Sequence, residues 1–140
     1  NLKILDIGCD RELTLLQYLD YKGYQVLEYR GIDQDFDITL YTFNKRETLY
    51  NVNHESADDW FINYLPFISF LKIDCEGCED KWISIMKRNG FPDIYMAIAI
   101  HDFSEKYEFN RNVLEHRGFK KAYVTPDKRE ILYIKKPVKK

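Results

Sequence analysis

The chain has 140 residues, of which 45% are hydrophobic and 31% charged, a composition typical of one globular domain. Its formal net charge of −2 and its pI of about 5.9 argue against a nucleic-acid partner, because no overall positive field attracts phosphates. It contains no signal-peptide pattern and no apolar run of about 18 residues, so we expect a cytoplasmic protein without membrane contact.

Strand and helix patterns alternate in the first half of the chain. An apolar stretch that ends at Gly8 predicts a buried strand, and a helical period follows until residues 22–23. Residues 25–33 predict a second strand, whereas residues 34–56 show no clean period. Residues 58–65 then predict a short helix that a proline stops.

The second half continues the alternation and closes on a hairpin. Residues 67–74 and 94–100 are apolar runs typical of parallel strands that are buried on both faces. Helices are predicted after each run, with apolar faces at 82–86 and 109–114. Residues 119–135 predict two strands joined by a turn. This order predicts a mostly parallel sheet with an antiparallel hairpin at its C-terminal end.

Residues 70–79, with the sequence FLKIDCEGCE, are the most informative segment. A strand pattern ends there in Asp74 and Glu76, and Glu79 opens a helix pattern. Open α/β sheets bind ligands at the ends of such strands, and carboxylates there are costly to desolvate, so the cluster indicates a functional site. The alternative is that Glu76 and Glu79 only complement the positive end of the helix dipole.

Acidic residues also follow the first two predicted strands. Asp6 and Gly8 precede the first helix, where a glycine lets a ligand approach the backbone and free N–H groups. Asp33 comes 25 positions after Gly8, where an acid can bind the ribose hydroxyls of an adenosine-bearing cofactor. A plain tight turn and a turn aspartate are the alternatives. Arg11 and Glu12 replace the glycines of a dinucleotide site, which argues against a nicotinamide dehydrogenase.

His101 ends the apolar run of residues 94–100. A histidine at the ligand-facing end of a strand can accept a proton, since its pKa lies near working pH. The alternative is an imidazole that is satisfied by backbone groups at the strand end.

The chain has three cysteines, and an odd number does not form a disulfide framework, so we expect reduced thiols. Cys75 and Cys78 form a C-x-x-C pair that would need Cys9 and His101 to complete a zinc site. Cysteine often serves as a small buried hydrophobe, and we predict no metal site.

In this arrangement the chain resembles the FkbM-type methyltransferases. The segments that carry the resemblance are Asp6-x-Gly8, Asp33, residues 57–59, residues 70–79 and His101. The resemblance implies a Rossmann-like three-layer α/β sandwich that forms a single domain over residues 1–140. The chain departs from the family in the missing glycine at residues 11–12, in a short stretch between 33 and 58, and in the N-terminal elements that precede the first strand in many members.

The resemblance further implies transfer of a methyl group from S-adenosylmethionine to a hydroxyl of a small molecule or glycan. The residues expected at the cofactor are Asp6, Gly8, Cys9, Asp33, Gln34, Asp58 and Asp74. Asp74 and Glu76 are expected to orient the sulfonium and the acceptor. His101 is the first candidate for the base that accepts the acceptor's proton, and Glu76 is the second.

Two other functional classes stay open. The altered first motif favours a degenerate methyltransferase fold that serves as a binding module. An RNA-directed methyltransferase would need a local basic face, for which the candidates are Lys81, Lys87, Arg88, Lys120 and Lys121.

Overall fold

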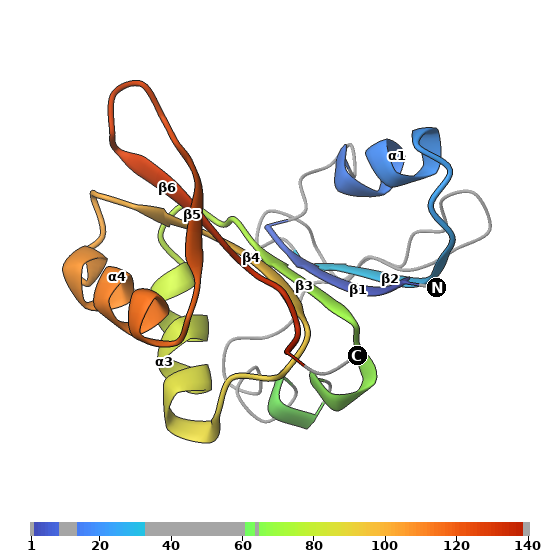
Figure 1. Cartoon of the computed structure of the whole chain (residues 1–140), viewed down its shortest axis with the longest axis horizontal. Helices are drawn as coiled ribbons and strands as arrows, with labels where there is room; N and C mark the ends of the chain where they lie inside the picture. Colours follow the sequence, from blue (N-terminus) through green and yellow to red (C-terminus); the bar gives the residue numbers. More distant parts are fainter. Residues whose placement is uncertain (1, 9–13, 33–60, 64, 139–140) are drawn as a thin grey trace. The chain divides into compact units, whose positions relative to one another are not determined.

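The computed structural model describes residues 2–8, 14–32, 61–63 and 65–138, which fall into two compact units, Asn1–Lys72 and Ile73–Lys140 (Figure 1). Each unit is described by itself, and the single domain expected over residues 1–140 stays a prediction. Within the described ranges, no helix is long and apolar enough to cross a membrane.

The first unit contains β1 (Leu2–Ile7), α1 (Thr14–Tyr21), β2 (Val26–Ile32), η1 (Leu65–Phe67) and most of β3 (Phe70–Ile73). Its strand order is β2-β1-β3, and β1 and β2 are parallel. The strands predicted in residues 2–8 and 25–33 are confirmed, as is the helix between them. The strand expected from residue 67 begins only at Phe70, since the 3₁₀ turn around Pro66 includes Phe67 and the two residues after it also precede the strand.

One apolar cluster holds this unit together. Leu16 on α1 packs against Ile4 of β1 and against Val26 and Tyr29 of β2, and all four side chains are buried. The helix presents its apolar residues to the sheet at spacings of three and four, so Leu15 and Leu19 flank the same contact.

The second unit contains α3 (Glu79–Asn89), β4 (Tyr95–His101), α4 (Tyr107–His116), β5 (Lys120–Val124) and β6 (Glu130–Lys135). Its strand order is β4-β6-β5, and both pairings are antiparallel. Both helices contact β4 and each other (Figure 1). The predicted terminal hairpin is therefore confirmed, and its second strand is the one that pairs with β4.

Buried side chains from both helices and two strands form the core of the second unit. They are Trp82, Ile83, Ile85 and Met86 of α3, Val113 and Leu114 of α4, Met96, Ile98 and Ile100 of β4, and Ile131 and Tyr133 of β6. By contrast, every residue of β5 is exposed, as expected for the outer strand of this hairpin. The core holds the end of β4 and the start of β6 at fixed positions.

Tyr133 is a buried tyrosine of this core, and its hydroxyl makes the stability of the fold depend on pH in the alkaline range. Burial of the ring raises the pKa of Tyr133 to about 12, and the hydrogen bond that its hydroxyl donates to Glu115 acts in the same direction. The folded chain then keeps a proton that the unfolded chain loses near pH 10. The stabilisation is complete below pH 10 and is lost as the pH rises toward 12.

We therefore expect the free energy of unfolding of the wild type to fall between pH 10 and pH 12 by up to about 2–3 kcal/mol more than that of Tyr133→Phe. Denaturant unfolding at several alkaline pH values measures the difference. Tyr123→Phe, on the exposed strand β5, is the matched control and should follow the wild type. Parallel pH profiles for the wild type and Tyr133→Phe would contradict this account.

Candidate active site

The candidate site lies in the second unit around His101, the last residue of β4. The antiparallel register places His101 directly opposite Glu130, the first residue of β6. Opposed residues of such a pair project on the same side of the sheet. The Nε2 atom of His101 accordingly lies 3.2 Å from Oε1 of Glu130, and only 7% of the histidine is exposed.

Glu79 holds the other side of the imidazole. It is the first residue of α3 and is fully buried. Its Oε2 accepts a hydrogen bond from the His101 backbone N–H at 3.0 Å and lies 3.0 Å from Nδ1 of the same residue. Its Oε1 accepts a hydrogen bond from the Gly77 N–H at 2.7 Å. Glu79 therefore does more than complement the helix dipole, because it fixes the ring and ties two segments together.

Asp74 supplies a third carboxylate, with its Oδ1 3.8 Å from Nε2 of His101. Burial by itself lowers the pKa of His101, but the hydrogen bond to Glu79 and the charges of Glu79, Glu130 and Asp74 outweigh it, so the pKa is raised above 6.5. Both ring nitrogens of His101 therefore have side-chain carboxylates as partners, whereas the alternative from the sequence was that backbone groups satisfy them. The site favours positive charge at Nε2.

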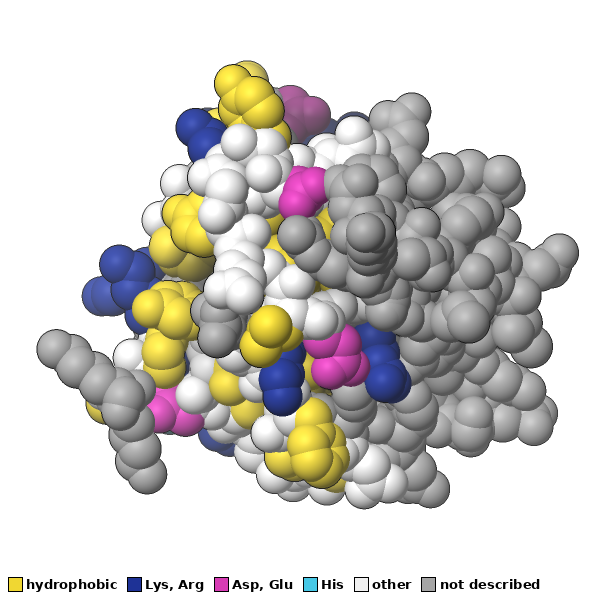
Figure 2. Space-filling view, turned by 90° about the vertical axis from the view of Figure 1, so that its right-hand side faces the viewer, with side chains coloured by type: hydrophobic (Ala, Val, Ile, Leu, Met, Phe, Trp, Pro, Cys, Tyr) yellow, Lys and Arg dark blue, Asp and Glu magenta, His cyan; other side chains and the backbone are white. Residues whose placement is uncertain are grey.

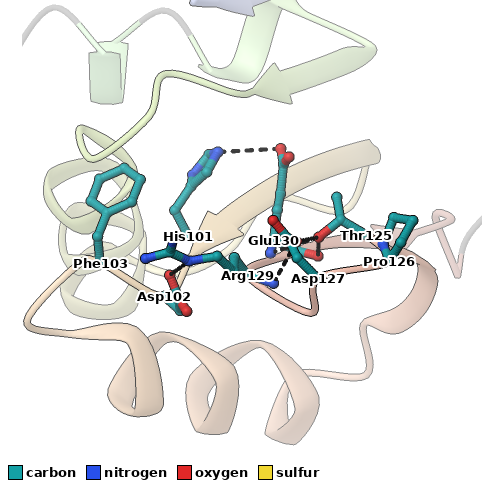
Figure 3. Close-up of a pocket in the computed structure, with 8 residues that line it drawn as sticks. All are labelled: His101, Asp102, Phe103, Thr125, Pro126, Asp127, Arg129 and Glu130. Atoms are coloured by element: carbon teal, nitrogen blue, oxygen red, sulfur yellow. Dashed lines mark hydrogen bonds and ion pairs between the residues drawn. The ribbon is translucent and has the colours of Figure 1, made fainter.

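A cavity of about 570 Å³ opens beside His101. Its lining residues are His101, Asp102, Phe103, Thr125, Pro126, Asp127, Arg129 and Glu130. Figure 3 shows the side chains of His101 and Glu130 pointing toward each other, while Arg129 turns to Asp102 at 3.4 Å. The Phe103 ring lies 5.3 Å from the imidazole, centroid to centroid. Both Phe103 and Arg129 are exposed, so the cavity is open to a ligand of moderate size.

The turn between Asp74 and Glu79 corrects the expectation of reduced thiols. Cys75 and Cys78 form a disulfide, with their Cα atoms 5.4 Å apart. Two left-handed residues between them, Glu76 at φ 48° and Gly77 at φ 115°, fold the chain back so that the two sulfurs meet. The bonded sulfurs cannot complete the zinc set that was considered with Cys9 and His101. Glu76 is exposed in this turn, and its role as second candidate base stays a prediction.

Gly77 provides a test of how this turn supports the site. A Cβ atom there would lie 3.3 Å from Cε1 of Phe103. We expect Gly77→Ala to cost about 1–3 kcal/mol of unfolding free energy for the left-handed backbone, and to push Phe103 away from His101. The ring-proton NMR shifts of His101 report the displacement, because they depend on the neighbouring aromatic ring.

Gly90→Ala is the matched control, since Gly90 has φ 101° and nothing lies within 4 Å of its added Cβ. It should lose stability to a similar extent and leave the His101 shifts unchanged. Unchanged shifts in Gly77→Ala as well would show that the glycine does not position Phe103.

In the first unit, Asp6 is fully buried in β1. Its Oδ2 accepts a hydrogen bond from the Tyr29 hydroxyl at 2.6 Å, and its Oδ1 lies 3.4 Å from Nζ of Lys72. These contacts give the acid a structural task, and its contact with a cofactor stays a prediction. Gly8 has φ 84°, a left-handed conformation that favours glycine, and its role at a cofactor stays a prediction.

Of the remaining residues expected at the cofactor, one is described by the structure. Cys9, Asp33, Gln34 and Asp58 lie outside the described residues. Asp74 is described and belongs to the group around His101. Within the described ranges, the structure therefore joins two of the predicted catalytic residues, His101 and Asp74, and adds Glu79, Glu130 and Phe103 to them.

Comparison with known proteins bears on the fold. No family model matches the chain. Uncharacterized protein 158B of Sulfolobus islandicus rod-shaped virus 1 is 34% identical over 82 residues, which cover 58% of this chain and 48% of that protein. The chain thus aligns with about half the length of this relative.

Two solved structures resemble the whole chain. One, from Plasmodium falciparum, is described as a ribosomal RNA methyltransferase. It has a TM-score of 0.57 and is 17% identical in sequence, and the match covers 98% of this chain and 86% of that protein's chain. The other, from Streptococcus pneumoniae, is described as a tRNA (m1A22) methyltransferase in complex with S-adenosyl-L-methionine. It has a TM-score of 0.56 and is 14% identical in sequence, and the match covers 100% of this chain and 68% of that protein's chain. The chain has the Rossmann-like α/β fold of these methyltransferases, as predicted, and neither comparison identifies the FkbM subtype.

Proposed function

We propose that the protein is an S-adenosylmethionine-dependent methyltransferase that acts on RNA. The observation that carries this proposal is the similarity of fold over almost the whole chain to two methyltransferases described as acting on ribosomal RNA and transfer RNA. One of them was solved with S-adenosyl-L-methionine bound, which supports the same cofactor here. The comparisons favour RNA over the small-molecule or glycan acceptor expected from the sequence.

The expectation that the partner is not a nucleic acid is thereby corrected. It rested on the net charge of the whole chain, which averages two unlike units. Asn1–Lys72 contain 7 Lys and Arg against 12 Asp and Glu, whereas Ile73–Lys140 contain 14 against 11. The basic excess lies in the unit that contains His101, where phosphate attraction would help an RNA to bind.

The basic face considered from the sequence is partly exposed in the second unit. Lys87 and Arg88 are exposed at the end of α3, and Lys120 and Lys121 are exposed on β5, whereas Lys81 is half-buried. Figure 2 shows a face on which the described Lys and Arg side chains lie scattered among acidic and hydrophobic ones. The positive charge that would attract RNA phosphates is therefore confined to the exposed lysines and arginine of α3 and β5.

The residues around His101 suit the proton transfer that methylation requires. S-Adenosylmethionine, when bound, supplies a methyl group that is attached to a sulfonium. Loss of this methyl group turns the sulfonium into a neutral thioether. The acceptor atom forms the new bond to carbon and loses its proton. His101 accepts this proton at Nε2 when the imidazole is neutral, and Glu79 and Glu130 stabilise the resulting imidazolium at 3.0 and 3.2 Å.

The residues proposed at the cofactor are those expected from the sequence: Asp6, Gly8, Cys9, Asp33, Gln34, Asp58 and Asp74. Calorimetric titration with S-adenosylhomocysteine tests the assignment. We expect micromolar binding to the wild type and a loss of about 10–100-fold in Asp33→Ala, because an ionised hydrogen-bond acceptor is removed. Glu105→Ala, an exposed acid in the second unit, is the control and should bind normally.

Absence of binding to the wild-type chain would overturn the proposal. The fold would then serve as a binding module without methyl transfer, which is the alternative that the altered first motif favours.

A further inference from the structure

Three side chains, two of which line the cavity, are arranged as a chelating set. Asp74 follows β3, His101 ends β4 and Glu130 begins β6, and each offers one ligand atom within 4.8 Å of the other two. We propose that Asp74, His101 and Glu130 bind a divalent transition-metal cation such as Mn²⁺. This site goes beyond methyl transfer and contrasts with the prediction of no metal site from the sequence.

The distances suit a common cation. Ligand atoms held about 2.1 Å from one metal lie roughly 3–3.5 Å from each other. Nε2 of His101 lies 3.2 Å from Oε1 of Glu130, within this range, and 3.8 Å from Oδ1 of Asp74, which a small rotation of the aspartate would shorten. The strand register keeps His101 and Glu130 opposed, so the backbone holds these two ligands beside each other.

Glu79 provides an independent reason to assign this site. Histidines that bind metals commonly present their second ring nitrogen to a carboxylate, which fixes the tautomer and orients the ring. Glu79 is placed in this way, with Oε2 at 3.0 Å from Nδ1 of His101. The carboxylate is itself fixed by the N–H groups of Gly77 and His101. Nε2 is thereby aimed at the two acids.

Charge and access point to the same occupant. Three carboxylates lie within 3.8 Å of one imidazole, so the group has an excess of negative charge that a cation would neutralise. Arg129, which also lines the cavity, is paired with Asp102 at 3.4 Å. His101 and Glu130 line the cavity, which leaves coordination positions open for water or a ligand.

The ligand types favour Mn²⁺ over Mg²⁺. Imidazole suits transition metals such as Zn²⁺ and Fe²⁺, whereas carboxylates suit Mg²⁺, Ca²⁺ and Mn²⁺. Mn²⁺ is the transition metal among the cations that carboxylates suit, and the set has two carboxylates for one imidazole. Mg²⁺ prefers oxygen ligands alone and retains its water molecules. We therefore expect Mg²⁺ to compete poorly for the site.

The inference does not rest on the proposed function, because it concerns a cation and the free protein. A cation on Nε2 would occupy the lone pair that is assigned to the acceptor's proton. If both proposals hold, added Mn²⁺ inhibits methyl transfer, and the binding measurement below requires neither cofactor nor RNA.

Electron paramagnetic resonance of free Mn²⁺ during titration of the chelator-treated 140-residue chain tests the site. One site with a dissociation constant below about 100 μM is expected. Glu130→Gln should weaken binding at least 10-fold, since it removes a charged ligand while keeping the side-chain shape. Glu79→Gln should weaken it about 10–100-fold by loosening the ring of His101.

Asp127→Asn is the matched control, because Asp127 lines the same cavity outside the chelating set and should bind Mn²⁺ as the wild type does. Circular dichroism of each variant verifies that it is folded. The proposal is overturned if the folded wild type binds no Mn²⁺ at 1 mM, or if Glu130→Gln binds it as tightly as Asp127→Asn.

Discussion

Replacement of Glu79 by alanine is expected to lower the free energy of unfolding by about 3–5 kcal/mol. Its fully buried carboxylate accepts hydrogen bonds from the backbone N–H groups of Gly77 and His101 and contacts Nδ1 of the imidazole. Alanine would leave these groups buried without their acceptor and would open a small cavity at the start of α3. Urea-induced unfolding, followed by circular dichroism, measures the loss.

Two variants separate this network from a general effect of losing an acid at a helix start. Glu79→Gln keeps an oxygen acceptor and should lose less stability than Glu79→Ala. Glu108→Ala, in the first turn of α4, removes an exposed acid that pairs with Arg111 and should cost less than about 1 kcal/mol. A loss below 1 kcal/mol in Glu79→Ala would show that the buried network does not organise the site.

His101→Ala is expected to reduce methyl transfer by about 10²–10⁴-fold, the range by which general-base catalysis accelerates such steps. The residue lies against the cavity with Glu79, Glu130 and Asp74 around its ring, and no other histidine among the described residues is placed in this way. Affinity for S-adenosylhomocysteine should stay within about threefold of wild type, because the base acts on the acceptor. Initial rates at saturating cofactor, together with calorimetry, separate the two effects.

His116→Ala is the control, since His116 is exposed at the end of α4 and lies outside the cavity lining. Its rate should equal that of the wild type. Full turnover by a folded His101→Ala protein would remove the histidine from the mechanism and leave Glu76 as the candidate base.

Much of the fold could be predicted from local patterns. The apolar runs at 2–8 and 94–100 became β1 and β4, and the turn-forming residues at 126–129 marked the hairpin of β5 and β6. These signals are local, because burial on one or both faces dictates the spacing of apolar residues along each element. The start of β3 was misplaced because the residues around Pro66 are apolar and yet form a 3₁₀ turn.

The sequence predicted the site residues that end a strand or begin the following helix, such as Glu79. Asp74 and His101 carry that signal, whereas Glu130 does not, since its place opposite His101 depends on a register between strands far apart in the sequence. The partner of Asp6 was missed for the same reason, as Tyr29 lies 23 residues away. The disulfide was missed because a count of three cysteines says nothing about a turn that brings two of them together.

The most direct measurement is transfer of a tritiated methyl group from S-adenosylmethionine to a pool of ribosomal and transfer RNA by the 140-residue chain. The account predicts label in the RNA fraction that is sensitive to ribonuclease, that is abolished by excess S-adenosylhomocysteine and that falls at least 100-fold in His101→Ala but not in His116→Ala. Absence of label in RNA, with cofactor binding intact, would contradict the assignment of RNA as the substrate.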